Sequence, residues 1–172
     1  MSVGNQNSPV GSQETLIRYA TDGDVSVLLE LFEKSRLEGQ IRENDTGADL
    51  DHLVAGYFES KDSGFWVAEH DAIIVGMIGV QRIDDNAAEI RRLRVRKGFR
   101  RRGIGTRLME HAISFCRDKQ FLKVVLDVRI ERSPAIELFG AFGFLHGRER
   151  DLDGRKLLDF YLDLYTDTSE SQ

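Results

Sequence analysis

The sequence has few of the features that mark secreted and membrane proteins. Its 172 residues contain one cysteine, Cys116, which excludes an internal disulfide framework and is compatible with a reducing cytoplasm. The longest apolar run, residues 72–80, is much shorter than the roughly 20 residues that span a bilayer. The N-terminus lacks a basic segment followed by an apolar one, so no secretory signal is visible. We therefore expect a cytoplasmic protein with no membrane partner.

Charge and histidine content exclude two further classes. The formal net charge is −5, so the protein as a whole does not bind nucleic acid by bulk electrostatics. Cys116 lies on the apolar side of a predicted helix and is interpreted as a small core residue in preference to a reactive thiol. The histidines lack the spacing of metal ligands, and we expect no metal site; they are His52, His70, His111 and His146.

The length fits one domain with its own core. We predict a disordered segment at residues 1–14, a single domain at residues 15–166 and a frayed tail at residues 167–172. The order of predicted elements is that of a mixed α/β sheet with helices on both faces. Strands are predicted at residues 16–21, 65–69, 73–82, 87–95, 123–128, 144–148 and 156–164, and helices at residues 24–32, 50–58, 103–119 and 133–143.

Local signals predict how some of these elements begin, turn and pack. Asp24 is expected to cap the first helix, and Ser133 the last one, with Pro134 at its first helical position. The pair His70-Asp71 is expected to turn a hairpin. Residues 123–128 form a near-continuous apolar strand, which is typical of a sheet that is covered on both faces.

The strand at residues 87–95 departs from simple alternation. Ile90 and Leu93 are apolar, and strict alternation puts them on opposite faces, since they are three residues apart. If both face the core, one extra residue is absorbed near Arg91-Arg92 as a β-bulge. The alternative is a strand with two apolar faces whose arginines project at its edges.

A basic, glycine-containing turn follows this strand. Nine Lys or Arg residues and no acid lie between Arg91 and Arg107, although the whole chain is acidic. The turn leads into a predicted helix, whose first N–H groups have no partner within the helix and whose dipole favours an anion. Gly103 and Gly105 let the backbone approach a ligand closely. These residues predict a site for a phosphate or pyrophosphate group.

The motif Arg100-x-x-Gly103-x-Gly105 resembles the pyrophosphate signature of the GNAT superfamily of N-acetyltransferases, and the resemblance extends over residues 16–165. It implies the GNAT fold, in which the sheet splays between strands four and five and the pantetheine arm of acetyl-CoA enters the wedge. It also implies that the main chain of Leu93, Arg94 and Val95 meets the pantetheine and the acetyl carbonyl. The loop residues implied in cofactor binding are Arg100, Arg101, Arg102, Gly103, Ile104, Gly105 and Thr106.

Acetyl transfer to an amine requires a neutral amine, so a base is expected. Glu89 stands eleven residues before Arg100 in an Ala-Glu-Ile context, and the resemblance implies that it is the base, acting through water. The alternative is a solvated strand glutamate that pairs with a neighbouring arginine. Asp127 resembles a second catalytic position of the family, and its alternative is a structural carboxylate near Arg129.

The last predicted helix departs from the pattern N-x-x-A-x-x-L-Y that is common in the family. Arg132 stands in the Asn position and Phe139 in the Tyr position, where the family has a general acid for the leaving thiolate. Phe139 cannot donate a proton; Tyr161 and water are the two alternatives, and the sequence favours neither. Arg132 is expected in solvent, with contact to the phosphates of the coenzyme as the alternative.

The resemblance therefore implies an enzyme that moves an acetyl group from acetyl-CoA to a primary amine by direct attack. A non-catalytic acyl-CoA-binding module of the same fold is the alternative. A nucleic-acid-binding domain would need stacking aromatic residues beside the basic turn, where Phe99 is alone. The acceptor stays unidentified. Acidic residues at 43–51 and 151–153 either attract a cationic amine or form solvated loops, and a homodimer is one state that the family allows.

Overall fold

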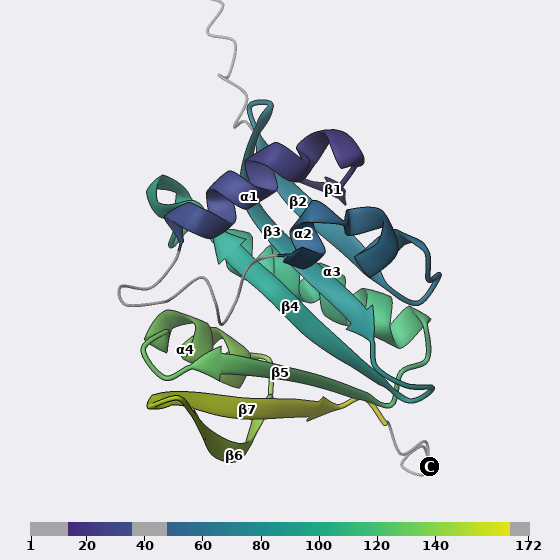
Figure 1. Ribbon diagram of the computed structural model, residues 1–172, viewed down its shortest axis with the longest axis vertical. Helices are drawn as coiled ribbons and strands as arrows, with labels where there is room; N and C mark the ends of the chain where they lie inside the picture. Colours follow the sequence, from purple (N-terminus) through teal and green to yellow (C-terminus); the bar gives the residue numbers. More distant parts are fainter. Residues whose placement is uncertain (1–13, 36–47, 166–172) are drawn as a thin grey trace, which may run out of the picture.

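The structure is a computed structural model that describes residues 14–35 and 48–165. Most of the predicted disordered segment and all of the predicted tail lie outside these ranges. One seven-stranded sheet has the order β1-β2-β3-β4-β5-β7-β6 (Figure 1). Its strands are β1 (Leu16–Tyr19), β2 (Gly64–His70), β3 (Ile73–Arg82), β4 (Ala87–Val95), β5 (Lys123–Arg129), β6 (Leu145–Leu152) and β7 (Arg155–Asp163). The helices are α1 (Val25–Lys34), α2 (Ala48–Asp51), α3 (Ile104–Asp118) and α4 (Ser133–Ala141), with short helical turns η1 (Asp22–Asp24), η2 (Val54–Phe58) and η3 (Lys97–Phe99).

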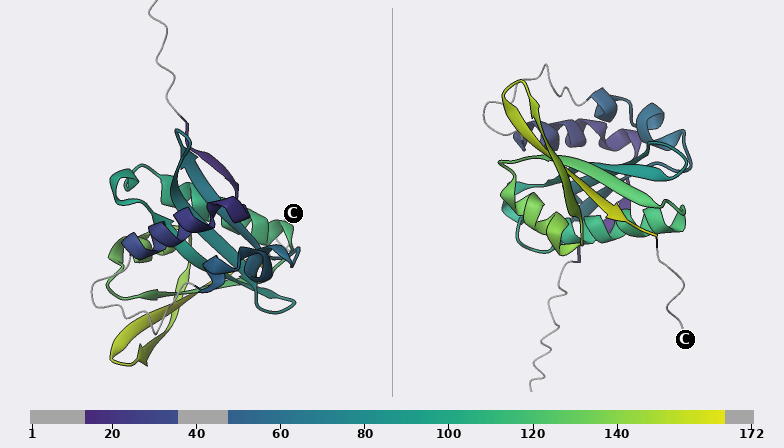
Figure 2. Two further views of the ribbon diagram at one scale, coloured as in Figure 1. Left: turned by 45° about the horizontal axis from the view of Figure 1, so that its top comes forward. Right: turned by 90° about the horizontal axis from the view of Figure 1, so that it is seen from below.

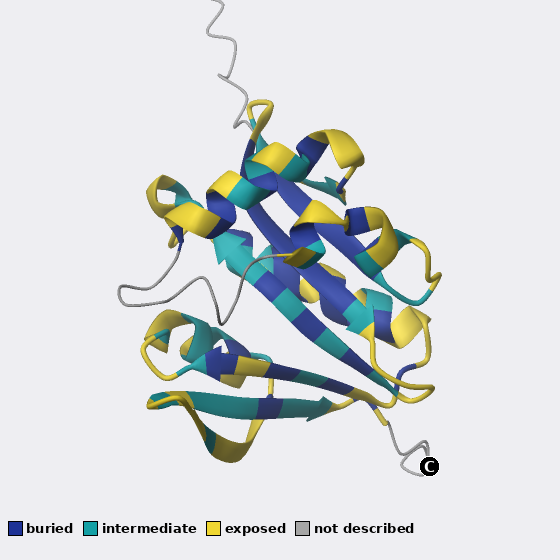
Figure 3. Ribbon diagram, viewed as in Figure 1, coloured by how far each residue is buried: buried dark blue, intermediate teal, exposed yellow. Residues whose placement is uncertain are grey.

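The observed order confirms the predicted fold class, a mixed sheet between two helical layers. Helices α1 and α2 cover one face, and α3 and α4 cover the other (Figure 2). Successive residues of β2 point into two different cores, because side chains alternate along a strand. Phe65 packs with Leu28 and Tyr57 under α1 and η2, whereas Trp66 packs with Leu108 of α3. The central strands are thus buried on both faces, while β6 at the edge is exposed (Figure 3).

Four local predictions are corrected by the observed geometry. The turn between β2 and β3 is Asp71-Ala72, both with positive φ (52° and 62°), so His70 ends the strand. The segment predicted as one helix at residues 50–58 begins as α2 and continues as the wider turn η2. The carboxylate of Asp24 does not cap α1, because it accepts hydrogen bonds from Arg18 and from the backbone N–H of Thr21. The α4 helix starts at Ser133, one residue earlier than predicted, and Ser133 makes no capping hydrogen bond.

The apolar sequence of β5 predicted a strand that is covered on both faces, and this prediction is wrong. Its burial alternates: Val124, Leu126 and Val128 are buried against α3 and α4, whereas Asp127 on the opposite face is exposed. The short helices α1 and α2 cover strands β2 to β4 and leave this part of the sheet open (Figure 1). The open face lies beside the cavity described below. Among the described residues, no helix has the length and apolar character needed to cross a membrane.

Strand β4 contains the β-bulge that the sequence left open. Met77 of β3 pairs with Arg94 and Gly79 pairs with Arg91, so one residue of β3 lies opposite two residues of β4. Arg92 has a φ of 60°, which is uncommon for a residue with a side chain and absorbs the extra residue. Ile90 and Leu93 both pack against the core under α3 as a result. The alternative strand with two apolar faces is excluded.

Candidate active site

The central feature is a wedge between the only parallel pair of strands in the described sheet. β4 and β5 are paired at Ala87–Glu89 with Lys123–Val125, and no pairing continues beyond these residues. The strands diverge beyond Glu89, where the bulge of β4 follows, and a cavity of about 160 Å³ opens between them. Backbone groups of β4 that face β5 are therefore available to a ligand. The cavity is lined by Glu89, Ile90, Arg91, Arg92, Leu93, Arg94, Leu126, Asp127 and Phe139.

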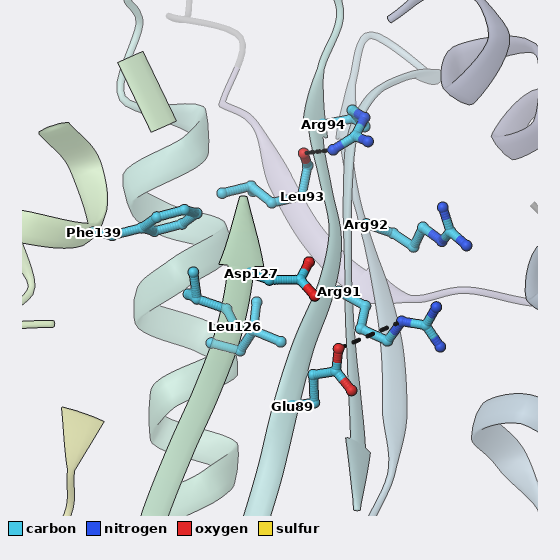
Figure 4. A pocket seen from close by; sticks show the side chains of 9 residues that line it. Glu89, Arg91, Arg92, Leu93, Arg94, Leu126, Asp127 and Phe139 are labelled. Atoms are coloured by element: carbon cyan, nitrogen blue, oxygen red, sulfur yellow. Dashed lines mark hydrogen bonds and ion pairs between the residues drawn. The ribbon is translucent and has the colours of Figure 1, made fainter. Parts of the chain in front are cut away.

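The lining of the cavity differs between its two sides (Figure 4). Leu93, Leu126 and Phe139 make an apolar side toward α3 and α4. Arg91 and Arg92 point the other way, toward α1 and α2. The alternation of each strand, changed at the bulge, produces this separation. An apolar chain suits one side, and a charged group suits the other.

Glu89 faces the cavity from the last paired position of β4, opposite Val125. Its carboxylate lies 4.0 Å from Nε of Arg91, which is an ion pair without a short hydrogen bond. Burial raises the pKa of Glu89, Arg91 opposes this effect, and the nearby charge of Asp127 adds to it. A carboxyl group with a raised pKa is a better proton acceptor than an ordinary glutamate.

Asp127 faces the same cavity from β5, so the structure brings the two candidate catalytic carboxylates together (Figure 4). Its side chain is half-exposed and accepts a hydrogen bond of 3.2 Å from Nη2 of Arg150. Arg129, which the sequence suggested as a structural partner, instead donates to Glu131 at 3.0 Å. Asp127 therefore lies at the open end of a surface network, whereas Glu89 lies deeper.

The bulge residue Arg92 is held by a buried ion pair. Its Nη2 and Nε donate to the Asp49 carboxylate at 2.6 Å and 3.1 Å, and its guanidinium lies 4.9 Å from the centre of the Phe32 ring. Tyr57 also donates to Asp49, at 2.6 Å. Burial alone raises the pKa of Asp49, but the hydrogen bonds from Arg92 and Tyr57 lower it below its usual value. Asp49 is thus engaged inside the fold. It is not available to attract a cationic amine, which was one interpretation of the acidic segment.

The other acidic segment has a local role as well. Asp151 accepts a hydrogen bond of 2.8 Å from the backbone N–H of Gly154, in the turn that joins β6 to β7. Residues 43–47 of the first segment lie outside the described part of the chain. The described residues of the two acidic segments therefore stabilise a turn and a buried ion pair, and they do not form a cation site beside the cavity.

The basic turn after β4 ends in an open helix N-terminus. Gly103 is the N-cap of α3, with φ 77° and ψ 8°, and no side chain caps the helix there. The backbone N–H of Arg107 is bonded to the carbonyl of Gly103 at 3.0 Å, so the N–H groups of Ile104, Gly105 and Thr106 precede the first helical hydrogen bond. A left-handed residue at this point favours glycine. This end of α3 fits an anionic ligand.

Side chains of the turn have different tasks. Arg100 donates from Nε to the Val95 carbonyl at 3.1 Å, which ties the turn to the end of β4. Arg102 lies over the Phe99 ring, 5.1 Å from its centre. Arg101 is exposed and has a positive φ of 61°. Leu93 accepts a hydrogen bond of 2.8 Å at its carbonyl from the neighbouring side chain of Arg94.

Comparison with known proteins decides the family. The sequence model of the acetyltransferase (GNAT) family matches residues 28–144. The chain belongs to the GNAT family. N-acetyltransferase 8 of Homo sapiens is 32% identical over 101 residues, which are 56% of this chain and 44% of that protein. N-acetylaspartate synthetase of Danio rerio is 34% identical over 97 residues, 56% of this chain and 34% of that protein. The chain thus spans less than half the length of these two curated relatives.

Solved structures show that the GNAT fold is shared. An acetyltransferase of the GNAT family from Staphylococcus aureus Mu50 has a TM-score of 0.78 at 23% identity, with 88% of this chain and 100% of that chain covered. The yncA protein from Salmonella typhimurium, whose structure contains its cofactor acetyl-CoA, has a TM-score of 0.73 at 19% identity. That match covers 91% of this chain and 98% of the other. The expected splay between strands four and five agrees with this fold.

Phe139 of α4 and Arg132, which precedes this helix, are the two positions where the sequence departs from the GNAT pattern. Phe139 lines the cavity and packs near Phe144 and Phe160, so an aromatic ring without a hydroxyl occupies this place. Arg132 was expected in solvent, and the structure corrects this prediction. The side chain is half-buried and donates to the Ser35 carbonyl at 2.9 Å. It joins the entrance of α4 to the end of α1. Among the described residues, no group of three His, Cys, Asp or Glu side chains is arranged to hold a metal.

Sequence reasoning did not assign Arg91 or Arg92 to the cavity of the GNAT domain, and it did not pair Arg92 with Asp49. The consecutive arginines inside an otherwise apolar strand were the only signal, and they were interpreted as evidence for the bulge alone. Asp49 was considered only as part of the acidic segment at residues 43–51, because its partner Arg92 is 43 residues away in the sequence. The buried Cys116 thiol, in contrast, is where the sequence predicted it, and burial raises its pKa to about 12.

Proposed function

We propose that the protein is an N-acetyltransferase that transfers the acetyl group of acetyl-CoA to a primary amine by direct attack. The observation that carries the proposal is the divergence of β4 from β5 beyond Glu89, which opens a cavity with a carboxylate at its closed end. Membership of the GNAT family and the presence of acetyl-CoA in the yncA structure support the same co-substrate.

The chain has suitable groups for each part of acetyl-CoA. The N–H groups of Ile104, Gly105 and Thr106, with Arg100, Arg101 and Arg102 beside them, suit the pyrophosphate, because the left-handed Gly103 leaves this helix end uncapped. The main chain of Leu93, Arg94 and Val95 lies on β4 beyond its last pairing with β5, and the side that faces β5 suits the pantetheine and the acetyl carbonyl. A fixed N–H donor at that carbonyl would stabilise the negative charge that develops on its oxygen.

Glu89 is the proposed base. A lysine-like amine with a pKa of about 10.4 is mostly protonated at neutral pH, and it must lose a proton before it attacks. Glu89 takes that proton through water, for which a cavity of about 160 Å³ has room. Its raised pKa favours this role, and the charge of Asp127 helps to raise it. Asp127 is the second candidate for the base.

In the reaction, a bond forms between the amine nitrogen and the acetyl carbon, and the carbon–sulfur bond of the thioester breaks. Acetyl-CoA supplies the activated acetyl group and leaves as the CoA thiolate. Phe139 has no proton to give, and the departure of an unprotonated thiolate of pKa about 8.5 at pH 7 costs about 2 kcal/mol. This cost is compatible with turnover.

The first test is titration of acetyl-CoA into the purified protein by calorimetry. Micromolar affinity is expected for the wild type, and its loss is expected in Gly103→Glu, which adds a negative charge at the helix end. Gly98→Glu is the matched control, because Gly98 lies in the same turn with nothing within 4 Å of an added Cβ. Failure of the wild type to bind acetyl-CoA would overturn the proposed function.

The absence of a hydroxyl at Phe139 favours one second candidate, a non-catalytic module that binds acyl-CoA. The two candidates differ in turnover. An enzyme releases free CoA when an amine is supplied, and Glu89→Gln slows the release. A binding module retains acetyl-CoA affinity, releases no CoA with any amine and is unaffected by Glu89→Gln.

A further inference from the structure

The basic turn after β4 packs on the end of the β2–β3 hairpin through one aromatic residue. Phe99 of η3 is partly buried against the core under α3, and its ring centre lies 5.7 Å from that of His70, with 59° between the two planes. The guanidinium of Arg102 lies 5.1 Å from the centre of the same Phe99 ring. A continuous series of contacts therefore leads from His70 on the sheet to Arg102 in the turn.

His70 is the fixed end of this series. Its Nδ1 lies at hydrogen-bond distance, 3.1 Å, from Oγ1 of Thr15, the residue before β1. Its Nε2 lies 3.7 Å from the Asp71 carboxylate, and its side chain is 22% exposed. The backbone of His70 pairs with Ile73 across the hairpin turn. The imidazole is thus held by groups on two strands, and it offers Phe99 a surface that is already in place.

Arg102 is the open end of the series. The residue is exposed, and within residues 14–35 and 48–165 its guanidinium makes no hydrogen bond or ion pair. Its five N–H donors are therefore available to the phosphates of a ligand at the N-terminus of α3. An exposed arginine loses side-chain entropy when it binds a phosphate, and it loses less when an aromatic ring restrains it beforehand. The attraction between the guanidinium and the ring supplies this restraint.

We propose that His70 is a positioning residue for coenzyme binding, because it holds Phe99 in the place where the ring orients Arg102 toward the phosphates of acetyl-CoA. The proposal rests on the proposed function, which assigns the coenzyme to this turn. In this arrangement His70 touches neither the coenzyme nor the acetyl group. Loss of its ring therefore weakens the binding of acetyl-CoA and leaves the chemical step unchanged.

Calorimetric titration of acetyl-CoA into the whole chain tests this role. His70→Ala is expected to raise the Kd about 3- to 10-fold, which corresponds to the contribution of an aromatic pair. His70→Phe keeps a ring against Phe99 and is expected to restore the Kd to within about twofold of wild type. His52→Ala is the matched control, because His52 is an exposed histidine between α2 and η2, and its Kd is expected to equal that of wild type.

Arg102→Gln separates a positioning role from a merely structural one. This variant removes the guanidinium and is expected to raise the Kd about tenfold. If His70 acts through Arg102, His70→Ala adds no more than about twofold in the Arg102→Gln background, whereas independent effects would multiply.

Phe99→Leu is a second variant of the same contact. It keeps an apolar side chain against the core and removes the ring, so its Kd is expected to match that of His70→Ala. Thermal unfolding of each variant shows whether it is folded at the temperature of the titration. Because the two variants change different residues, the contact stays testable if one of them is too unstable to titrate.

The outcomes separate this proposal from the proposed function. An unchanged Kd in His70→Ala or Phe99→Leu, a loss that His70→Phe does not restore, or effects that multiply with Arg102→Gln would overturn the positioning role and leave the acetyltransferase intact. Failure of the wild type to bind acetyl-CoA would overturn both.

Discussion

The buried pair Arg92–Asp49 makes a strong prediction, because it holds the bulge that opens the cavity. The side chains are 6% and 12% exposed. Replacement of one partner of a buried ion pair costs about 3–5 kcal/mol, since the other charge loses its compensation. In Asp49→Asn the amide oxygen still accepts from Tyr57, and Phe32 still packs against Arg92. We therefore expect Asp49→Asn to lower the free energy of unfolding by about 3 kcal/mol, near the lower limit of this range.

For a chain of this size, a loss of 1 kcal/mol lowers the melting temperature by about 2–4 °C, so a decrease of about 6–12 °C is expected. The measurement is urea and thermal unfolding followed by tryptophan fluorescence. Trp66 is the only tryptophan and is 1% exposed, so its emission reports loss of the core between the sheet and α3. Acetyl-CoA affinity is also expected to fall, because the bulge positions Leu93 beside the cavity.

Asp51→Asn is the control for this variant. Asp51 lies in the same short helix and is exposed, and its replacement is expected to change stability by less than about 0.5 kcal/mol. If Asp49→Asn were as stable as this control, the ion pair would not hold the bulge, and the argument from burial would be refuted.

Three further predictions concern pH, thiol reactivity and the helix end. Burial raises the pKa of Glu89 in the folded protein. The contribution of this carboxyl group to stability is therefore full below the unfolded pKa of about 4.3, and it is lost as the pH rises through the folded pKa. Glu89→Gln should melt at a higher temperature than wild type at pH 7 and at the same temperature below about pH 4. Cys116, with a pKa of about 12, should react with a thiol reagent only after unfolding, and rapid labelling of the native protein would contradict its burial. Gly103→Ala should lose about 1 kcal/mol of stability at its φ of 77° and bind acetyl-CoA less tightly, whereas Gly98→Ala should do neither.

Several features of the fold and the candidate site were predictable because they depend on neighbours in the sequence. The apolar face of α3, the buried Cys116 and the helix start at Gly103 follow from a period of 3.6 residues and from the conformational freedom of glycine. The order of strands and helices follows from alternation and from turn residues, and it confirmed the fold class. The corrected turn at Asp71-Ala72 shows the limit of this reasoning, because a boundary can move by a residue without changing the hydrophobic pattern.

The tertiary structure decided the features that depend on distant partners. The sequence allowed two forms of β4, and the bulge was chosen because Arg92, turned by its positive φ, meets Asp49 from α2. The Asp24 carboxylate is bonded to Arg18 of β1 and to the backbone N–H of Thr21, and not to the helix it precedes, because these partners already occupy it and the charged one makes a strong hydrogen bond. In the same way, the two carboxylates share one cavity only because β4 and β5 are parallel neighbours that diverge. The sequence by itself determined the elements and the basic turn, and long-range contacts determined the shape and charge of the site between them.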